Sequence, residues 1–170
     1  MSEVPQRNIV LIGMMGSGKT TVGRALAAGL DRPFLDTDDL ILAHEQRKLS
    51  AIIAEEGRER FLEIEQKHVL ALDVRGYVLS TGGSMIYSAG AMEHLKAQGT
   101  VVWLDCPLED LAKRLGDLDA RGVVRLPGQT LADLVRERVP LLERWADARV
   151  DAGGEDIGAT VHRVRGAIGH

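Results

Sequence analysis

A glycine-rich loop between an apolar strand and a helical pattern constrains the fold of this chain more than any other feature. Residues 13–20 read G-M-M-G-S-G-K-T and fit the phosphate-binding pattern G-x-x-x-x-G-K-[ST]. The apolar run 8–12 precedes the loop, and a helical pattern over 21–28 follows it. A glycine-rich turn with a chance lysine is the alternative, but the strand and the helix around the loop argue against it.

The residue types in this loop match the chemistry of polyphosphate binding. Glycines let backbone N–H groups approach the phosphates, and the following helix directs the positive end of its dipole at the same anion. The Lys19 ammonium is expected to reach the β- and γ-phosphates, and the Thr20 hydroxyl is expected to bind Mg²⁺. The expected ATP-binding residues of the loop are Gly13, Gly16, Ser17, Gly18, Lys19, Thr20 and Thr21.

Short apolar strands alternate with amphipathic helices along the rest of the chain. We expect strands at 8–12, 33–35, 77–80, 100–104 and 149–150, and helices at 21–28, 38–54, 60–74, 89–97, 108–115, 131–145 and 157–168. Near-continuous apolar strands indicate a parallel sheet that is covered on both faces. The pattern predicts an α/β fold of the P-loop NTPase type, with a central five-stranded parallel sheet in a three-layer α/β/α sandwich.

Composition limits the partners of the chain. Its 170 residues fit one domain, 1–170, and 21 basic against 25 acidic residues give a net charge of −4 without a long basic run. We therefore expect no nucleic-acid partner, and no window is apolar enough for a membrane span. A cytoplasmic monomer is the expectation. The single cysteine, Cys106, is expected to pack as a small hydrophobe, and the five histidines to lie at the surface without metal-ligand spacing.

Polar residues follow the expected strands at the edge where ligands bind in parallel sheets. Asp36 and Asp38 follow the second strand, so one carboxylate could support Mg²⁺ and the other could accept a proton from an attacking hydroxyl. Capping of a helix by either residue is the alternative, and one residue could do both. Gly82 and Gly83 follow the third strand and allow a close approach to a ligand, although a tight turn explains them nearly as well.

The segment 116–128 has no clear periodicity and carries two arginines, Arg121 and Arg125. Long unpatterned segments in compact domains are often lids, and phosphoryl transfer needs both the exclusion of water and stabilisation of the negative charge on the transferred group, which an arginine can supply. We predict that this segment is a mobile lid with one working arginine, and a solvated loop is the alternative.

Several segments resemble the shikimate kinase family, in the same order and over almost the whole chain. They are G-M-M-G-S-G-K-T-T-V-G at 13–23, F-L-D-T-D at 34–38, E-G-R-E-R-F at 56–61, L-S-T-G-G at 79–83, E-R-V-P-L at 137–141 and V-D-A at 150–152. The resemblance implies transfer of the ATP γ-phosphate to a ring hydroxyl of shikimate, with Mg²⁺ as the metal. It also implies that the helical segment 38–74 binds the acceptor.

The resemblance assigns roles to individual positions. Lys19, Asp38 and Arg121 are the implied catalytic residues, with Asp38 orienting or deprotonating the acceptor hydroxyl. Thr20 and Asp36 are the implied Mg²⁺ residues. Arg114 matches a residue that lies against adenine, and Arg121 falls on the lid arginine that contacts ATP. The implied acceptor-binding residues are Asp38, Gly82, Gly83 and Arg138, the last as a carboxylate-binding arginine.

The acceptor-binding segments depart from the family pattern. Leu62 stands where the family has a carboxylate-binding arginine, and Ser84 and Leu142 also differ from the pattern. Arg58 lies one helical turn before Leu62 and is a candidate to replace the missing guanidinium. A kinase with another hydroxylated acceptor is therefore an alternative to shikimate kinase. An alternative of another class is a non-catalytic nucleotide or metabolite sensor.

Overall fold

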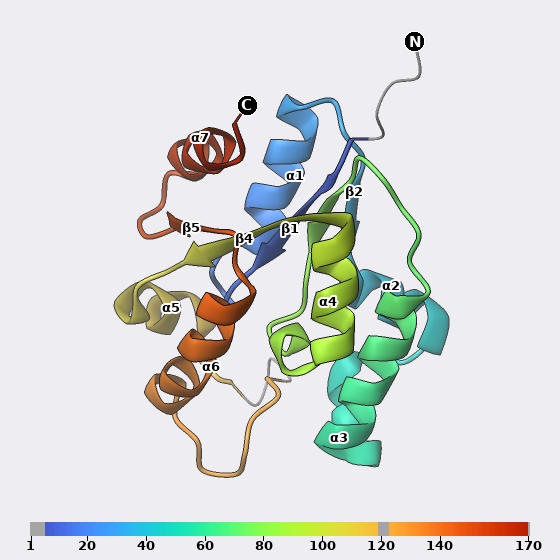
Figure 1. Ribbon diagram of the computed structural model, residues 1–170. Helices are drawn as coiled ribbons and strands as arrows, with labels where there is room; N and C mark the ends of the chain where they lie inside the picture. The colour runs from blue at the N-terminus through green and yellow to red at the C-terminus, as the bar shows by residue number, and fades with distance from the viewer. Residues whose placement is uncertain (1–5, 119–122, 170) are drawn as a thin grey trace.

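Five parallel strands form a single sheet in the order β2-β3-β1-β4-β5 (Figure 1). The computed structural model describes residues 6–118 and 123–169. The strands are β1 (Asn8–Ile12), β2 (Phe34–Asp36), β3 (Val78–Ser80), β4 (Gly99–Asp105) and β5 (Ala148–Asp151). Central strand β1 pairs with both β3 and β4, and all five of its side chains are buried. The predicted five-stranded parallel sheet is confirmed.

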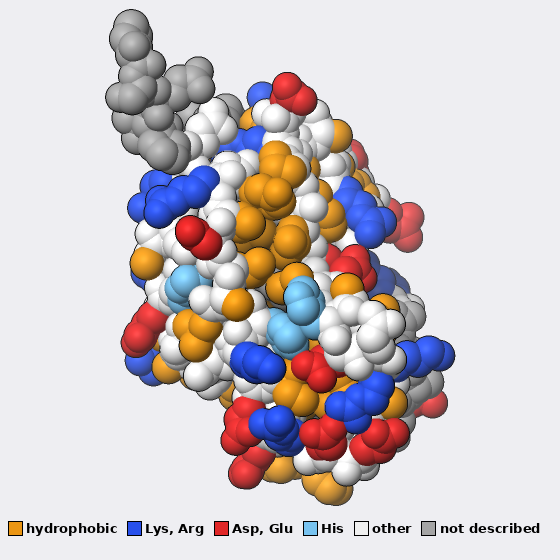
Figure 2. Space-filling view, turned by 90° about the vertical axis from the view of Figure 1, so that its right-hand side faces the viewer, with side chains coloured by type: hydrophobic (Ala, Val, Ile, Leu, Met, Phe, Trp, Pro, Cys, Tyr) orange, Lys and Arg blue, Asp and Glu red, His pale blue; other side chains and the backbone are white. Residues whose placement is uncertain are grey.

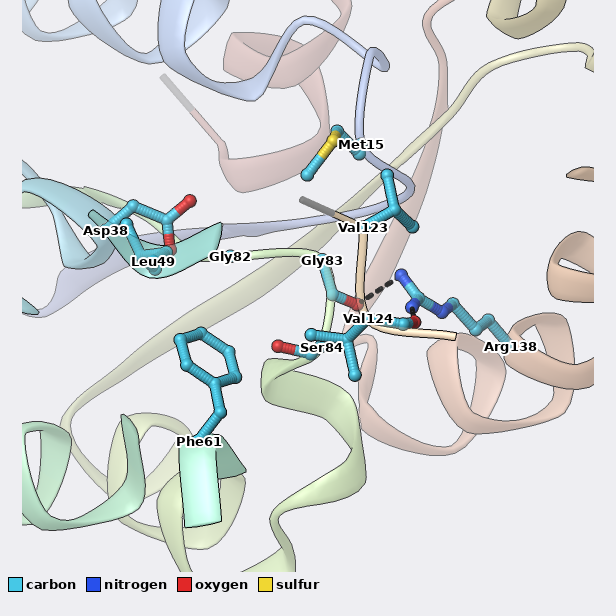
Figure 3. Close-up of a pocket in the computed structure, with 10 residues that line it drawn as sticks. All are labelled: Met15, Asp38, Leu49, Phe61, Gly82, Gly83, Ser84, Val123, Val124 and Arg138. Atoms are coloured by element: carbon cyan, nitrogen blue, oxygen red, sulfur yellow. Dashed lines mark hydrogen bonds between the residues drawn. The ribbon is translucent and has the colours of Figure 1, made fainter. Parts of the chain in front are cut away.

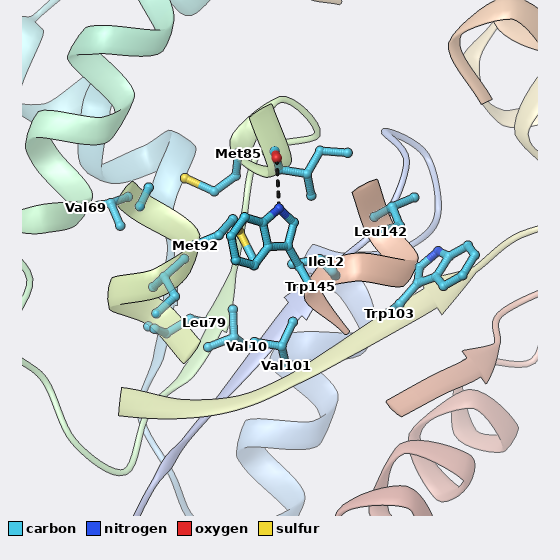
Figure 4. Packing of buried hydrophobic residues seen from close by; sticks show 13 residues of the cluster. Val10, Ile12, Val69, Leu79, Met85, Met92, Val101, Trp103, Leu142 and Trp145 are labelled. Carbon is cyan, nitrogen blue, oxygen red and sulfur yellow. Dashed lines mark hydrogen bonds between the residues drawn. The ribbon is translucent and has the colours of Figure 1, made fainter. Parts of the chain in front are cut away.

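Helices cover both faces of the sheet, as predicted for a three-layer sandwich (Figure 1). They are α1 (Lys19–Gly29), α2 (Thr37–Glu45), α3 (Leu49–Leu70), α4 (Ala89–Gln98), α5 (Leu108–Leu115), α6 (Leu131–Trp145) and α7 (Ile157–Ile168), with a 3₁₀ turn, η1, at Met85–Tyr87. Val22 and Leu26 of α1 and Val164 of α7 share one apolar cluster with strand side chains. The cluster on the other face contains α4 and α6 residues, and Trp145 at its centre donates to the Ile86 carbonyl at 3.1 Å (Figure 4).

The helices between β2 and β3 differ from the prediction of 38–54 and 60–74. The first ends at Glu45, because Gln46 adopts a left-handed conformation (φ 56°) and its N–H donates to the Leu42 carbonyl. The second begins at Leu49 and is interrupted by non-helical Gly57 (φ 84°, ψ 170°). A break in the predicted interval 55–59 is therefore present, but a second break at 46–48 separates α2 from α3.

The expectation of five surface histidines is wrong for two of them. His68 is only 11% exposed and lies 2.7 Å from Glu45 Oε1, and partly buried His94 lies 2.7 Å from the Leu72 carbonyl. His170 lies outside the described residues. On the face shown in Figure 2, basic and acidic side chains are interspersed at the lower end. Exposed ion pairs of this kind include those of Arg47 with Glu55 and Glu56. No helix within 6–118 and 123–169 is long and apolar enough to cross a membrane.

Candidate active site

The loop after β1 leaves the first turn of α1 open for an anion. The helix begins after Gly18, which has a left-handed conformation (φ 92°), and neither a side-chain cap nor an acidic residue occupies its first turn. A Cβ atom at Gly13 would lie 2.7 Å from the Leu104 carbonyl, so only glycine fits there. Ser17 Oγ is buried and finds no hydrogen-bond partner among the described residues, a rare state that a phosphate oxygen would relieve. These features fit a bound polyphosphate.

The Lys19 side chain folds back over the loop, and its ammonium group bonds loop carbonyls. Its Nζ donates to the Gly13 carbonyl at 2.9 Å and to the Met14 carbonyl at 2.8 Å, and the residue is 7% exposed. Burial lowers the pKa of Lys19 to about 8, and the nearby Asp38 carboxylate opposes that shift. A phosphate would favour the charged ammonium further, because an opposite charge stabilises it.

Thr20 and Asp36 come together as predicted. Thr20 Oγ1 donates to Asp36 Oδ2 at 2.8 Å, while Asp36 Oδ1 accepts from the Asp38 N–H at 2.8 Å. Asp36 therefore caps α2 and contacts the phosphate-loop threonine at the same time. Among the described residues, no group of three or more His, Cys, Asp or Glu side chains could hold a metal. These two oxygens are suited to Mg²⁺ held also by phosphate oxygens and water.

Asp38 lies in the first turn of α2, directly after β2 and its neighbour Thr37. It lines both a cavity of about 210 Å³ beside Lys19 and Thr20 and a cavity of about 100 Å³ beside Phe61 and Arg138. Burial is the main cause that raises the pKa of Asp38 to about 6, followed by the Asp36 carboxylate. The group is therefore mostly ionised at neutral pH and can accept a proton.

Gly82 and Gly83 form the wall between the two cavities, because both residues line both of them. A Cβ atom at Gly82 would lie 2.6 Å from Asp38 Oδ1 and 3.1 Å from Glu65 Oε2. The Gly82 N–H donates to Thr37 Oγ1 at 3.1 Å, which fixes the turn against α2. The pair is therefore more than a tight turn, since side chains from α2 and α3 converge on it.

Arg138 on α6 supplies the guanidinium of the smaller cavity and is 1% exposed (Figure 3). Its Nη1 donates to the Gly83 carbonyl at 3.0 Å and its Nη2 to the Val124 carbonyl at 2.5 Å. Its Nε donates to the Tyr87 hydroxyl at 3.3 Å, and that hydroxyl donates to Glu137. The structure thus holds Arg138 in place at the cavity wall through backbone carbonyls.

Arg58 and Leu62 do not line this cavity. The Arg58 guanidinium lies 4.8 Å from the centre of the Tyr87 ring and 3.8 Å from Glu137 Oε1, and its buried Nε has no partner. Leu62 packs against the apolar cluster of Phe61, Ile64 and their neighbours. The structure therefore does not place Arg58 in the position that the missing guanidinium would occupy.

Of the remaining predicted residues, Arg114 and Arg125 lie within the described part of the chain. Arg114 Nη1 donates to the Gly16 carbonyl at 3.1 Å, so α5 is tied to the loop. Arg121 lies outside the described residues. Arg125 donates to the Gln129 carbonyl at the far end of the segment. Val124 is buried among α2 and α3 side chains, so this part of the segment lies against the smaller cavity, beside Phe61 and Arg138.

Sequence reasoning missed one buried carboxyl group, that of Glu65. It lies on α3, is 0% exposed, and both of its oxygens lie near Ser84 Oγ, at 3.1 and 3.2 Å. A glutamate between Ile64 and Val69 on the apolar face of a helical pattern could have marked it. Its partner Ser84, 19 residues away, had no such signal.

The open helix N-terminus, the buried lysine and the cavity that meets it at Asp38 define the class of this protein, a P-loop kinase. The family model described as Shikimate kinase matches residues 15–168. A shikimate kinase of Cereibacter sphaeroides is 38% identical over 167 residues, covering 96% of this chain and 83% of that protein. A shikimate kinase from Acinetobacter baumannii, solved in complex with shikimate, aligns with a TM-score of 0.89 at 33% identity over 96% of this chain and 93% of that one.

A longer protein also contains a similar segment. Threonine synthase-like 1 of Macaca fascicularis is 40% identical over 151 residues, which cover 88% of this chain and 20% of that protein. The match of the family model and the near-complete coverage by shikimate kinases decide the assignment. The chain belongs to the shikimate kinase family, and membership implies ATP as the phosphate donor.

Proposed function

We propose that this protein transfers the γ-phosphate of ATP to a hydroxyl group of shikimate, with Mg²⁺, as a cytoplasmic monomer. The observation that carries the proposal is the common wall of the two cavities, formed by Asp38, Gly82 and Gly83. A donor bound at the loop and an acceptor bound beside Arg138 would meet at this wall. Such positioning is the main contribution of a protein to phosphoryl transfer.

The residues of the site divide the work. Lys19 and the first turn of α1 bind the phosphates, and Thr20 with Asp36 would hold Mg²⁺, which neutralises phosphate charge when bound. Arg138 binds the acceptor carboxylate, and Asp38 orients the acceptor hydroxyl and accepts its proton. Arg121 remains the proposed lid arginine.

The Leu62 position favours a second candidate function, a kinase with another hydroxylated acceptor. Leu62 packs into an apolar cluster and Arg58 lies over Tyr87, so among the described residues only Arg138 brings a guanidinium to the acceptor cavity. A carboxylate with one guanidinium partner is bound less tightly than one with two.

Coupled release of ADP tests both candidates. Turnover is measured with ATP and Mg²⁺ against shikimate and a panel of hydroxy acids, hydroxy amino acids and cyclitols. Shikimate turnover on the order of 1–100 s⁻¹ is the expected result. Silence toward shikimate with turnover of a panel compound would instead select the second candidate. Nucleotide binding without any turnover would point to a sensor.

A pair of neighbouring aspartates provides the matched control. Asp38→Asn should lower kcat about 10²–10⁴-fold, because a general base typically contributes that much. Asp39→Asn removes a carboxylate from the same helical turn at an exposed position and should leave kcat unchanged. Equal rates for the two variants would remove Asp38 from the proposed role.

A further inference from the structure

Glu65 is a buried carboxyl group that the reaction described above does not use. It reaches the acceptor site from α3, 0% exposed, and within residues 6–118 and 123–169 it forms no ion pair. Its hydrogen-bond partner is the Ser84 hydroxyl, which lies 3.1 Å from Oε1 and 3.2 Å from Oε2. Burial of an unpaired carboxylate is costly, and proteins avoid that cost by keeping the group neutral.

The surroundings of Glu65 favour the neutral form. Asp38 on α2 approaches the same glycine, since a Cβ atom at Gly82 would lie 2.6 Å from Asp38 Oδ1 and 3.1 Å from Glu65 Oε2. The pKa of Glu65 is raised to about 8, mainly by burial and secondly by the charge of Asp38. The Ser84 hydroxyl and the more distant Arg138 guanidinium oppose this shift.

Ser84 connects Glu65 with the acceptor. Ser84 lines the acceptor cavity and is 5% exposed (Figure 3), whereas Glu65 is not among the described residues that line it and contacts Ser84 Oγ at 3.1 Å. A serine hydroxyl has one proton to donate and can accept from another group. An ionised Glu65 can only accept hydrogen bonds, so the Ser84 hydroxyl would donate its hydrogen bond to Glu65 and not to the acceptor. A neutral Glu65 can donate its proton to Ser84 Oγ, which leaves the Ser84 proton free to point into the cavity.

We propose that Glu65 is a positioning residue of this site: as a neutral acid it donates to Ser84 Oγ, and Ser84 then donates a hydrogen bond to an oxygen of the acceptor. The neutral form also limits the site to one acidic charge, that of Asp38, which an acceptor with a carboxylate tolerates better than two. The pair thus supplies an uncharged donor in a cavity to which, among the described residues, Arg138 alone brings a guanidinium. The inference rests on the proposed kinase function for its kinetic consequences.

Acceptor binding should therefore depend on the protonation of Glu65. As pH rises through the pKa of Glu65, its carboxyl group becomes charged and accepts the hydrogen bond of the Ser84 hydroxyl. The KM for the acceptor should then rise, while kcat changes less. Lys19 also loses its proton near pH 8. Deprotonation of Lys19 should affect nucleotide binding, so ATP is kept saturating. Every variant contains Lys19, so this effect is common to all four proteins.

Four proteins separate these effects: the wild type, Glu65→Gln, Ser84→Ala and Glu63→Gln. The KM and kcat for the acceptor are measured from about pH 6 to about pH 9, with shikimate or with the panel compound that is turned over. A glutamine donates at every pH, so Glu65→Gln should keep the KM near the neutral-pH value and abolish its alkaline rise. Ser84→Ala should raise KM about 2–10-fold, the effect of one neutral hydrogen bond, with little change in kcat.

Glu63→Gln is the matched control, because Glu63 lies on the same helix but is 67% exposed. Its pH profile should coincide with that of the wild type. An alkaline rise in KM that persists in Glu65→Gln would overturn the proposal. A merely structural role predicts that Ser84→Ala lowers kcat by as large a factor as it raises KM, at every pH. That result would overturn the proposal as well.

A readout without turnover keeps this inference separate from the proposed function. Carboxyl ¹³C NMR of the ligand-free protein, assigned by the signal lost in Glu65→Gln, should show Glu65 neutral at pH 7 and titrating at a higher pH. Ser84→Ala should raise this pKa further, because the hydroxyl bond favours the ionised form. A Glu65 that is ionised at pH 6 would sink the inference even if the protein phosphorylates shikimate. Failure of all turnover with a neutral Glu65 would instead count against the proposed function.

Discussion

The phosphate end and the acceptor end of this site are built in different ways. At the proposed phosphate end, the loop backbone and the start of α1 are open to an anion, and no side chain within the described residues caps that helix. At the acceptor end, side chains from α2, α3 and α6 meet over a short glycine turn, and the donors of Arg138 already bond Gly83, Val124 and Tyr87. A loop that binds through its backbone tolerates little change, whereas an end assembled from side chains can change its ligand by a few substitutions.

The comparison explains why the donor can be assigned more sharply than the acceptor. Lys19 Nζ bonds the carbonyl of Gly13 in the phosphate loop, and Thr20 Oγ1 bonds Asp36 Oδ2, so the three side chains assigned to the donor lie at one edge of the sheet. At the other end, Leu62 and Ser84 replace residues of the family pattern, and each brings different chemistry to the site. The two ends can therefore be tested separately.

Among the changes that separate the two ends, the largest expected effect belongs to Lys19→Ala. The Lys19 ammonium is the buried cation at the phosphate end, so its removal should lower turnover on the order of 10³-fold, as loss of a transition-state donor does. The fold should persist, because Lys19 bonds only two loop carbonyls. ADP release and circular dichroism measure the two effects. Lys67→Ala, at an exposed position of α3, is the control. Unchanged turnover in Lys19→Ala would remove the assignment of the phosphate loop.

A smaller effect of opposite sign is expected for Leu62→Arg at the acceptor end. Leu62 itself does not line the acceptor cavity, but it adjoins Phe61, which does, and the longer arginine side chain should bring a guanidinium to the carboxylate of shikimate and strengthen its binding by about 1.5–3 kcal/mol. The KM for shikimate should then fall on the order of 10–100-fold, while the KM for ATP stays constant.

Leu62→Met is the control for this change, because it conserves volume and polarity against the cluster of Phe61 and Ile64. Its KM should match that of the wild type. An unchanged KM for shikimate in Leu62→Arg would mean that position 62 does not face the acceptor, and the contrast between the ends would lose its main support.

The fold and the phosphate end of the site could be predicted from the sequence, whereas much of the acceptor end could not. The strands and the loop 13–20 carry strong local signals, apolar runs and a spaced motif, so the fold and the placing of Lys19, Thr20 and Asp36 at one edge of the sheet were predictable. The break at Gln46 was not, because a non-glycine residue in the left-handed conformation leaves no clear pattern. The pairing of Glu65 with Ser84 and the position of Arg58 over Tyr87 depend on how α3 packs, which no local pattern encodes.

The smallest expected effect concerns the helix that carries Arg138. Thr130 Oγ1 accepts from the Asp133 N–H at 3.1 Å and Asp133 Oδ2 accepts from the Thr130 N–H at 2.9 Å, a capping box that begins α6. Thr130→Ala should cost about 1 kcal/mol and lower Tm by about 2–4 °C. Arg138 lies two turns further along, held by its own bonds to backbone carbonyls, so the acceptor KM should change less than about twofold.

Asp156→Ala provides the comparison on the opposite face of the sheet. Asp156 Oδ1 accepts from the Ala159 N–H at 3.0 Å and caps α7, which packs with α1 far from Arg138. Calorimetry should give both variants a similar loss of Tm, and the kinetics of both should match the wild type. A tenfold rise in acceptor KM in Thr130→Ala alone would contradict this expectation. In that case the first turn of α6 would belong to the acceptor end, and Arg138 would depend on the helix start as well as on its carbonyl partners.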